Sequence, residues 1–128
     1  MEHSFPTTAV NAVTSETIYK ICSKEEWDIA CANQRFEGSA IDLLDGYIHF
    51  STASQVEQTA RLHFNGQEGL VLVAVEARCL GDDLKWQAAR GGELFPHLFA
   101  TLDVEAATSV TDLPVAADGT HIFPPLED

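Results

Sequence analysis

Two separate segments of the chain carry the side chains that could do chemistry, and each contains one histidine. They are residues 45–52, with the sequence DGYIHFST, and residues 90–97, with the sequence RGGELFPH. A histidine titrates near neutral pH, so it can donate, accept or transfer a proton. Glu93 adds a carboxylate to the second segment. We expect the two segments to meet across a cleft in which His49, His97 and Glu93 are the candidate catalytic residues.

The first segment is predicted to place several functional groups on one face of a short strand. Alternate side chains of a strand point to opposite faces. Ile48 and Phe50 would therefore face a core, while the other face carries an aromatic ring, an imidazole and a hydroxyl: Tyr47, His49 and Ser51. This combination favours a binding site. The alternative is a half-buried His49 that only hydrogen-bonds Ser51 or Asp45.

The second segment combines a cation with residues that control the backbone. Arg90 precedes Gly91 and Gly92, which allow close approach and unusual backbone angles, so the arginine could hold a phosphate or carboxylate. The alternative is a salt bridge to one of the many acidic residues. Pro96 restricts the backbone next to His97 and could aim that side chain. The alternative leaves His97 on the surface.

The elements that would position these groups form a single compact α+β domain with mostly antiparallel strands and two main helices. We assign residues 17–128 to this domain and residues 1–16 to a flexible lead-in. A capping box from Ser23 to Glu26 predicts a helix to about residue 34, and Thr52 with Gln55 predicts a second that ends near Gly66. The start of the second helix would be an anion site close to His49.

The expected strands alternate apolar and polar residues or are apolar on both faces. The run Leu70–Val75 is apolar on both faces and should be a central, covered strand. Residues 35–45 are expected to be a loop, and residues 103–107 a helical turn. Trp27 and Trp86 are interpreted as core anchors. The other predicted strands are residues 17–22, 47–51, 84–87 and 108–113.

Composition limits the classes of partner. The 128 residues carry a net charge of −13, which repels nucleic-acid backbones and anionic membranes. A small anionic ligand would need a local basic pocket drawn from seven Lys and Arg residues. The three cysteines form no CxxC pair and are interpreted as core residues of a cytoplasmic protein. No metal-binding spacing such as HExxH is present, so no metal is expected.

The two segments together resemble the bacterial and plant "domain of unknown function 952" family. The run Ile18–Ile21 and the strand Leu70–Val75 match in order and spacing, and the resemblance covers about residues 17 to 124. The biochemical activity of this family is not established. The family resemblance therefore supports the expected cleft without giving it a reaction.

A more distant resemblance concerns the run from His49 through the helix near Gly66 to the Leu-Val-Leu-Val strand. It is similar to the corresponding run of RNA 2′-phosphotransferases, which have the ADP-ribosyltransferase fold and use NAD as a co-substrate. This implies an ADP-ribosyltransferase-like fold with a nicotinamide-ribose pocket formed near Tyr19, His49 and His97. Lys20 stands where those enzymes carry a histidine. His97 stands where poly(ADP-ribose) polymerases place a glutamate, with Glu93 nearby.

The resulting hypothesis is a protein that binds NAD or an ADP-ribose-type ligand and transfers or hydrolyses ADP-ribose. The alternative is a non-catalytic module that binds a small anionic metabolite or a partner protein through the same cleft. The sequence leaves open whether the protein is an enzyme, and it predicts no oligomeric state. The candidate ligand-binding residues are Tyr19, Lys20, Asp45, Tyr47, Ser51, Thr52, Arg90, Gly91 and Gly92.

Overall fold

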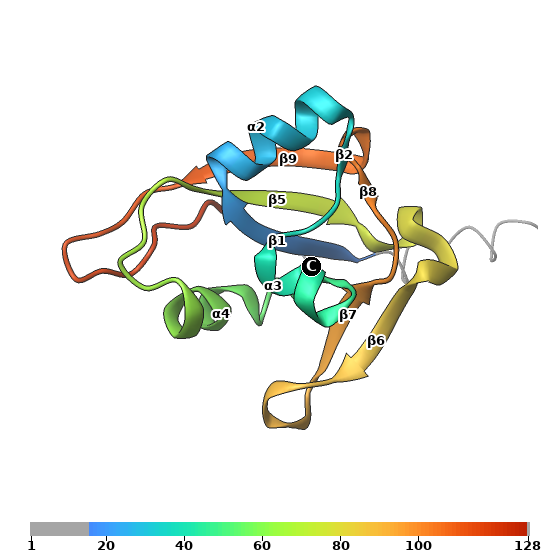
Figure 1. The fold of residues 1–128 in the computed structure, drawn as a ribbon. Helices are drawn as coiled ribbons and strands as arrows, with labels where there is room; N and C mark the ends of the chain where they lie inside the picture. Colours follow the sequence, from blue (N-terminus) through green and yellow to red (C-terminus); the bar gives the residue numbers. More distant parts are fainter. Residues whose placement is uncertain (1–15, 128) are drawn as a thin grey trace, which may run out of the picture.

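A four-stranded antiparallel sheet organises residues 16–127, the part of the chain described by the computed structural model (Figure 1). The predicted lead-in, residues 1–16, lies outside this part except for its last residue. β5 is central and buried along Leu70–Val75, which confirms the predicted covered strand. The strands follow the order β4 (Ser51–Thr52), β1 (Thr17–Ser23), β5 (Leu70–Glu76) and β9 (Ala107–Leu113).

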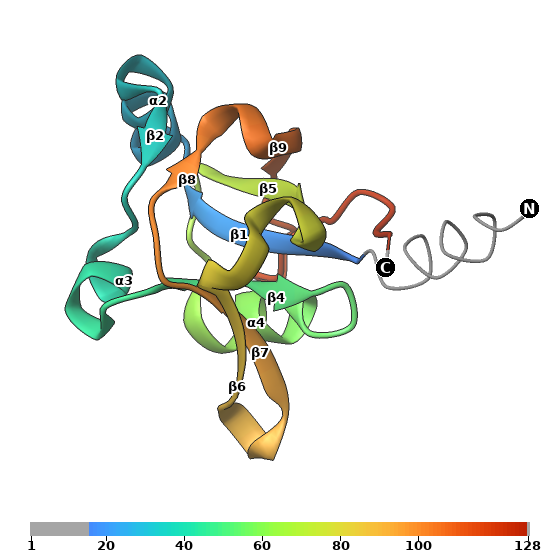
Figure 2. The same cartoon turned by 90° about the vertical axis from the view of Figure 1, so that its right-hand side faces the viewer.

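Two smaller antiparallel sheets complete the strand arrangement. One contains β3 (Ile48–His49), β7 (Leu94–Leu98) and β6 (Leu84–Ala88), and the other pairs β2 (Arg35–Phe36) with β8 (Leu102–Asp103). The β6–β7 hairpin extends away from the four-stranded sheet, on the side opposite α2 (Lys24–Asn33) (Figures 1 and 2). Three 3₁₀ segments connect the strands: η1 (Ala77–Asp83), η2 (Arg90–Gly92) and η3 (Val104–Ala106). The last of these agrees with the predicted helical turn.

The strand predicted over residues 47–51 is divided between two sheets. β3 pairs with β7, whereas β4 pairs with β1 at Ile18 and Tyr19. Between them the backbone N–H of Phe50 donates to the carbonyl of Pro96 at 3.0 Å. A single continuous strand was therefore wrong, because the chain leaves one sheet at His49 and enters the other at Ser51. This crossing places the first segment at the junction of the two sheets.

The predicted start of α2 is confirmed in detail. The Ser23 hydroxyl accepts the backbone N–H of Glu26 at 2.9 Å, and the Glu26 carboxylate accepts the N–H of Ser23 at 3.0 Å. Gln34 ends the helix in the left-handed conformation with φ 67°. The two bonds together satisfy N–H groups that a helix start otherwise leaves without partners.

α4 (Val56–His63) forms with a different start and end from those predicted. The Gln55 side-chain oxygen accepts the N–H of Thr52 at 3.0 Å, as expected. The Thr52 hydroxyl, however, lies 3.2 Å from the Ser54 hydroxyl and does not cap the helix. The helix ends at His63 and not near Gly66, because residues 64–69 form turns that lead into β5.

The segment predicted as a loop, residues 35–45, contains β2 and a third helix, α3 (Ala40–Asp45). The Asp42 carboxylate accepts the backbone N–H of Ser39 at 2.9 Å, which stabilises the first turn of α3. Gly46 ends this helix with φ 90°, a conformation that favours glycine. The Ser39-to-Asp42 spacing is a helix-start pattern, and the loop prediction missed it.

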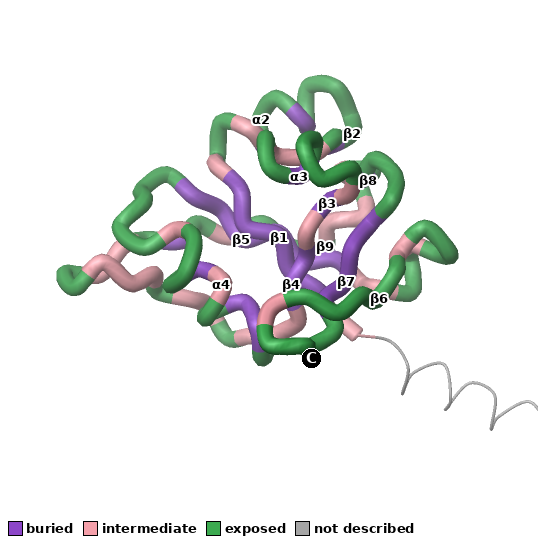
Figure 3. The backbone as a smooth tube through the Cα atoms, turned by 60° about the horizontal axis from the view of Figure 1, so that its bottom comes forward, coloured by how far each residue is buried: buried purple, intermediate pink, exposed green. Residues whose placement is uncertain are grey.

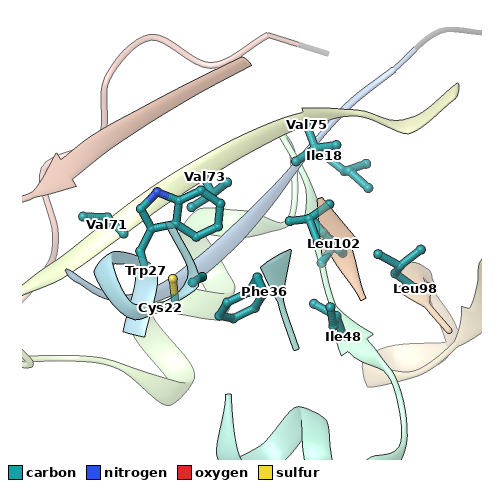
Figure 4. Close-up of a cluster of buried hydrophobic side chains, with 12 residues drawn as sticks. Ile18, Cys22, Trp27, Phe36, Ile48, Val71, Val73, Val75, Leu98 and Leu102 are labelled. Atoms are coloured by element: carbon teal, nitrogen blue, oxygen red, sulfur yellow. The ribbon is translucent and has the colours of Figure 1, made fainter. Parts of the chain in front are cut away.

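Two hydrophobic cores lie on opposite faces of the four-stranded sheet. Successive residues of β1 alternate between them, so Ile18 and Cys22 enter one core and Tyr19 and Ile21 the other. The first core packs against α2, β2, β3, β7 and β8 (Figure 4). The second packs against α4 and the C-terminal segment. β1, β5 and β7 are therefore the most buried strands, whereas β6 is exposed (Figure 3).

Some predicted core residues are exposed. Trp27 is buried against Phe36, as predicted, but Trp86 is 39% exposed, because β6 has exposed residues on both of its faces. Cys22 is buried, and this burial raises the pKa of its thiol to about 12. Cys31 and Cys79 are exposed, so their assignment to the core was wrong. Among residues 16–127, no helix is long and apolar enough to cross a membrane.

Candidate functional site

A cleft of about 550 Å³ lies at the junction of the two larger sheets. β4 pairs with β1 at Ile18 and Tyr19 only. Beyond Tyr19, this edge of β1 has no partner among the described strands. Lys20 and Ile21, the next two residues of β1, line the cleft. Aromatic and aliphatic side chains form much of its wall: Ile21, Ile41, Phe50, Phe64 and Phe95. The polar lining residues are Tyr19, Lys20, Asp45, His49, Ser51, Thr59, His63, Arg90 and His97.

Asp42 is the buried carboxylate that holds this site together. Its Oδ1 lies 2.6 Å from His49 Nδ1 and also accepts the backbone N–H of His49 at 3.1 Å. Its Oδ2 lies 2.7 Å from Lys20 Nζ and accepts the N–H of Ser39. Four donors thus surround a side chain that is 1% exposed, which fixes its position.

These contacts keep Asp42 ionised. Burial by itself would raise the pKa of the Asp42 carboxyl, because a charge is poorly solvated inside a protein. Hydrogen bonding from His49 and the positive charge of Lys20 lower it more, so the pKa is about 2. The buried Lys20 therefore has a full negative charge as its partner.

His49 has a carboxylate at each ring nitrogen. In addition to the Asp42 contact at Nδ1, its Nε2 lies 3.0 Å from Asp45 Oδ2. An ionised carboxylate can only accept hydrogen bonds, so both ring nitrogens must donate for both bonds to form. This arrangement fits a protonated imidazolium. The Asp45 side chain is 37% exposed and lines the cleft, unlike Asp42.

His97 is the cross-strand neighbour of His49 and has the opposite character. The two rings lie 5.4 Å apart between centroids, and His97 is buried. Its Nδ1 lies 2.7 Å from the Gln87 side-chain oxygen, so Nδ1 donates and Nε2 remains an acceptor. Burial, followed by the nearby His49, lowers the pKa of His97. His49 therefore donates from both ring nitrogens, whereas His97 donates from Nδ1 and keeps Nε2 as an acceptor.

Tyr47 supports both histidines from outside the cleft lining. Its ring stacks on His97 with a centroid distance of 4.2 Å and an interplanar angle of 25°. The same ring lies 4.6 Å from the His49 ring and 5.0 Å from the Phe99 ring. These contacts hold the imidazoles in place, and Tyr47 is not among the lining residues.

A second polar group of the cleft centres on the Thr59 hydroxyl of α4. It donates to the carbonyl of Gln55 at 3.1 Å, so it accepts from Ser51 at 3.0 Å and from Arg90 Nη2 at 3.3 Å. The Arg90 guanidinium carbon also lies 4.8 Å from the centre of the Phe95 ring. Within the described part of the chain, this is the one hydrogen bond of the guanidinium, so its other N–H donors have no partner there.

The remaining predicted site residues lie outside the cleft lining. Glu93 is exposed, with its carboxylate 3.4 Å from the Gln55 amide nitrogen, and that nitrogen also donates to the Leu94 carbonyl at 2.9 Å. Thr52, Gly91 and Gly92 likewise do not line the cleft. Neither does the start of α4, where Gln55 is already occupied by these bonds. The helix contributes two side chains, Thr59 and His63.

Sequence reasoning missed Asp42, Thr59 and Gln87, and it gave His63 no role. For Asp42 a signal existed, the capping spacing from Ser39, but it predicts a helix start and not a partner for Lys20. Thr59 and Gln87 have no distinguishing sequence context, because each acquires its role from a residue on another element. Among residues 16–127, no group of three or more His, Cys, Asp or Glu side chains could hold a metal ion.

Comparison with known proteins gives a family but no activity. The family described as "Protein of unknown function (DUF952)" matches residues 21–110. The crystal structure of protein CC0527 from Caulobacter crescentus is 55% identical, with a TM-score of 0.81, and the match covers 83% of this chain and 93% of that chain. The solution NMR structure of CC0527 is 56% identical, with a TM-score of 0.74, over 81% of this chain and 90% of that chain. No curated protein matches the chain.

Proposed function

This chain belongs to the DUF952 family, and we propose that it binds a nucleotide-like anionic ligand of the NAD or ADP-ribose class in the cleft. One observation carries this proposal: aromatic and polar side chains together line a cavity of about 550 Å³. Small-molecule sites typically combine a largely apolar wall with a few placed polar groups in a cavity of roughly 300–1,000 Å³. An ADP-ribosyltransferase-like relation is part of the same proposal.

Each part of such a ligand would meet a matching group. A planar base can lie against the aromatic wall near Phe64 and Phe95. Arg90, whose guanidinium keeps free donors, suits the phosphates. His97 lines the cleft, and its Nε2, as an acceptor, suits a ribose hydroxyl. The His49 ring, 5.4 Å from that of His97, offers its Nε2 as a donor once Asp45 is displaced.

A non-catalytic binding module is the second candidate function, and one observation favours it. Cleavage of a nicotinamide–ribose bond passes through an oxocarbenium-like state, which a nearby carboxylate stabilises. The carboxylate that lines the cleft, that of Asp45, is hydrogen-bonded to His49, and Glu93 lies outside the lining. Ligand binding is therefore better supported than turnover.

A titration followed by two-dimensional amide NMR tests the binding proposal. NAD, ADP-ribose and nicotinamide are added separately to labelled protein, and we expect saturable shifts at residues 19–21, 49–51 and 90–97. Arg90→Gln should weaken ADP-ribose binding by about tenfold. Arg61→Gln, an exposed residue of the same region on α4, is the matched charge control and should leave affinity unchanged. Folded protein without shifts at millimolar ligand would refute the proposal.

An assay of nicotinamide release separates the two candidate functions. Turnover of NAD by the parent protein, lost in Glu93→Gln while binding is kept, would support the enzyme. Binding with no nicotinamide release from the parent protein would support the module. We also propose a reducing, cytoplasmic setting, because Cys22, Cys31 and Cys79 are free thiols.

A further inference from the structure

Each ring nitrogen of His49 lies beside a carboxylate. Asp42 contacts the Lys20 ammonium at 2.7 Å and His49 Nδ1 at 2.6 Å. His49 Nε2, the other ring nitrogen, lies 3.0 Å from the Asp45 carboxylate, and both His49 and Asp45 line the cleft. Since an ionised carboxylate only accepts hydrogen bonds, Nε2 acts as a donor in this contact.

The two carboxylates are held very differently. Asp42 is 1% exposed and accepts from Lys20, Ser39 and both the ring and the backbone of His49. Asp45 is 37% exposed, and within residues 16–127 its carboxylate makes one hydrogen bond, to His49 Nε2. It is the last residue of α3, directly before Gly46. Rotation of its side chain would thus uncover Nε2 without breaking another side-chain hydrogen bond to residues 16–127.

We propose that His49 Nε2 is the subsite for an oxyanion of the ligand, a phosphate or carboxylate group, and that Asp45 occupies this subsite until the ligand displaces it. The inference rests on the proposed function, since it names the part of the cleft that takes the anionic group. A ligand oxygen can replace the Asp45 oxygen because it has the same charge sign and also accepts a hydrogen bond. Asp45 is then a competitor of the ligand and not a ligand-binding residue.

Inorganic phosphate is the first probe, and acetate in a separate arm represents carboxylates. Asp45→Asn keeps the size of the side chain but removes its charge, so it should bind phosphate about tenfold more tightly than the parent protein. Glu57→Gln makes the same change in net charge at an exposed position of α4 outside the cleft lining. Its phosphate affinity should stay within about twofold of the parent value. The tighter of the two probes identifies the preferred anion.

Chemical shifts of two side chains give a direct readout. As phosphate saturates the parent protein, the carboxylate carbon of Asp45 and Nε2 of His49 should shift together, with the same apparent affinity. The subsite would be refuted if Asp45→Asn bound neither phosphate nor acetate. It would also be refuted if Glu57→Gln increased phosphate affinity as much as Asp45→Asn does. A third refuting result is an anion titration that shifts other signals but leaves those of Asp45 and His49 unchanged.

The same variants separate this inference from the proposed function. If ADP-ribose binds the parent protein and Asp45→Asn does not bind it more tightly, the subsite is refuted and the proposed function stands. If phosphate binds at His49 but neither NAD nor ADP-ribose binds, the proposed function is refuted and the subsite stands. Nicotinamide carries no oxyanion, so its binding should be insensitive to Asp45→Asn.

Discussion

Individual side chains in the cleft depend on one buried ion pair. Lys20 and Asp42 contact each other at 2.7 Å with both side chains almost fully buried, and Asp42 also fixes the ring of His49. A buried charge is costly unless it is paired and hydrogen-bonded. Asp42 therefore serves stability and site geometry at once, whereas His97 is positioned separately, by Gln87 and the Tyr47 ring.

Asp42→Asn should strongly destabilise the protein. The amide keeps the size of the side chain but leaves Lys20 without its counter-charge, and breaking a buried pair in this way costs about 3–5 kcal/mol. Urea unfolding at neutral pH measures the change. Asp28→Asn is the control, because Asp28 pairs with Lys24 at 3.7 Å on the surface and should lose less than about 1 kcal/mol. Equal losses in the two variants would contradict the assigned role of Asp42.

His97 should make stability fall as the solution becomes mildly acidic. Its pKa is lowered from the ordinary value of 6.5, chiefly by burial, so the unfolded chain binds a proton more readily than the folded protein. The contribution of neutral His97 is thus complete above pH 6.5 and is lost as pH falls from there toward the lower folded pKa. Imidazole NMR titration should show this pKa directly.

Unfolding experiments at several pH values test whether protonation of His97 causes this loss of stability. Stability is measured across the same pH range for the parent protein and for His97→Gln. The parent should lose more stability on acidification than the variant, because the variant lacks the titrating group. Parallel pH dependences, or a His97 pKa at or above the ordinary value, would contradict the prediction.

At the scale of elements, the site depends on a chain that changes sheets. β3 holds His49 against β7, and β4 holds Ser51 against β1, so the two side chains reach the cleft from different sheets. Gln55 links these elements to α4. Its oxygen accepts from Thr52, and its nitrogen donates to the Leu94 carbonyl at the start of β7.

Gln55→Ala should therefore destabilise the protein, because it removes the hydrogen bonds that connect α4 with β4 and β7. Gln55 is buried, so the Thr52 N–H and the Leu94 carbonyl would both lose their partner, at a cost of about 2–3 kcal/mol. Gln58→Ala removes the same kind of side chain from an exposed position of α4 and should change stability by less than about 0.5 kcal/mol. Urea unfolding measures both variants. Faster amide exchange at Thr52 should accompany the first variant alone.

The sequence predicted elements well where the deciding interactions are local. The capping box at Ser23 and the two-faced apolar run of β5 are both local patterns, and both are confirmed. The division of residues 47–51 between two sheets could not be predicted, because it depends on pairing with β7 and β1. Asp42 was missed for the same reason: its partner Lys20 is distant in sequence. His49 and His97 were found because their residue types carry chemistry.

At the scale of the whole molecule, an acidic chain places two of its few cationic side chains at the cleft. The chain has a net charge of −13 and seven Lys and Arg residues, yet Lys20 and Arg90 both line the cleft. The C-terminal segment closes the second core beside this cleft through Phe123 and Leu126. Tyr19 joins the two regions, since it lines the cleft and hydrogen-bonds Glu127, 108 residues later.

Tyr19→Phe should loosen the C-terminal segment without disturbing the sheets. The hydroxyl donates to the Glu127 carbonyl at 2.9 Å and accepts the Glu127 N–H at 2.8 Å, and the ring itself is buried. Phenylalanine keeps the ring and removes both bonds, so we expect a loss of about 1 kcal/mol, because exposed Glu127 can bond water instead. Amide exchange at Glu127 should become faster while that of β5 stays slow.

The second tyrosine of the chain is the matched control. The Tyr47 ring packs on His97, and its hydroxyl has no hydrogen bond recorded among residues 16–127, so Tyr47→Phe should cost less than about 0.5 kcal/mol. Equal stability changes in the two variants, or unchanged exchange at Glu127 in Tyr19→Phe, would show that the segment is held by Phe123 and Leu126 alone. A larger stability loss in Tyr19→Phe than in Tyr47→Phe would instead show that the Tyr19 hydroxyl holds Glu127 against β1. Any ligand that moves Tyr19 should then also change amide exchange at the C-terminal end.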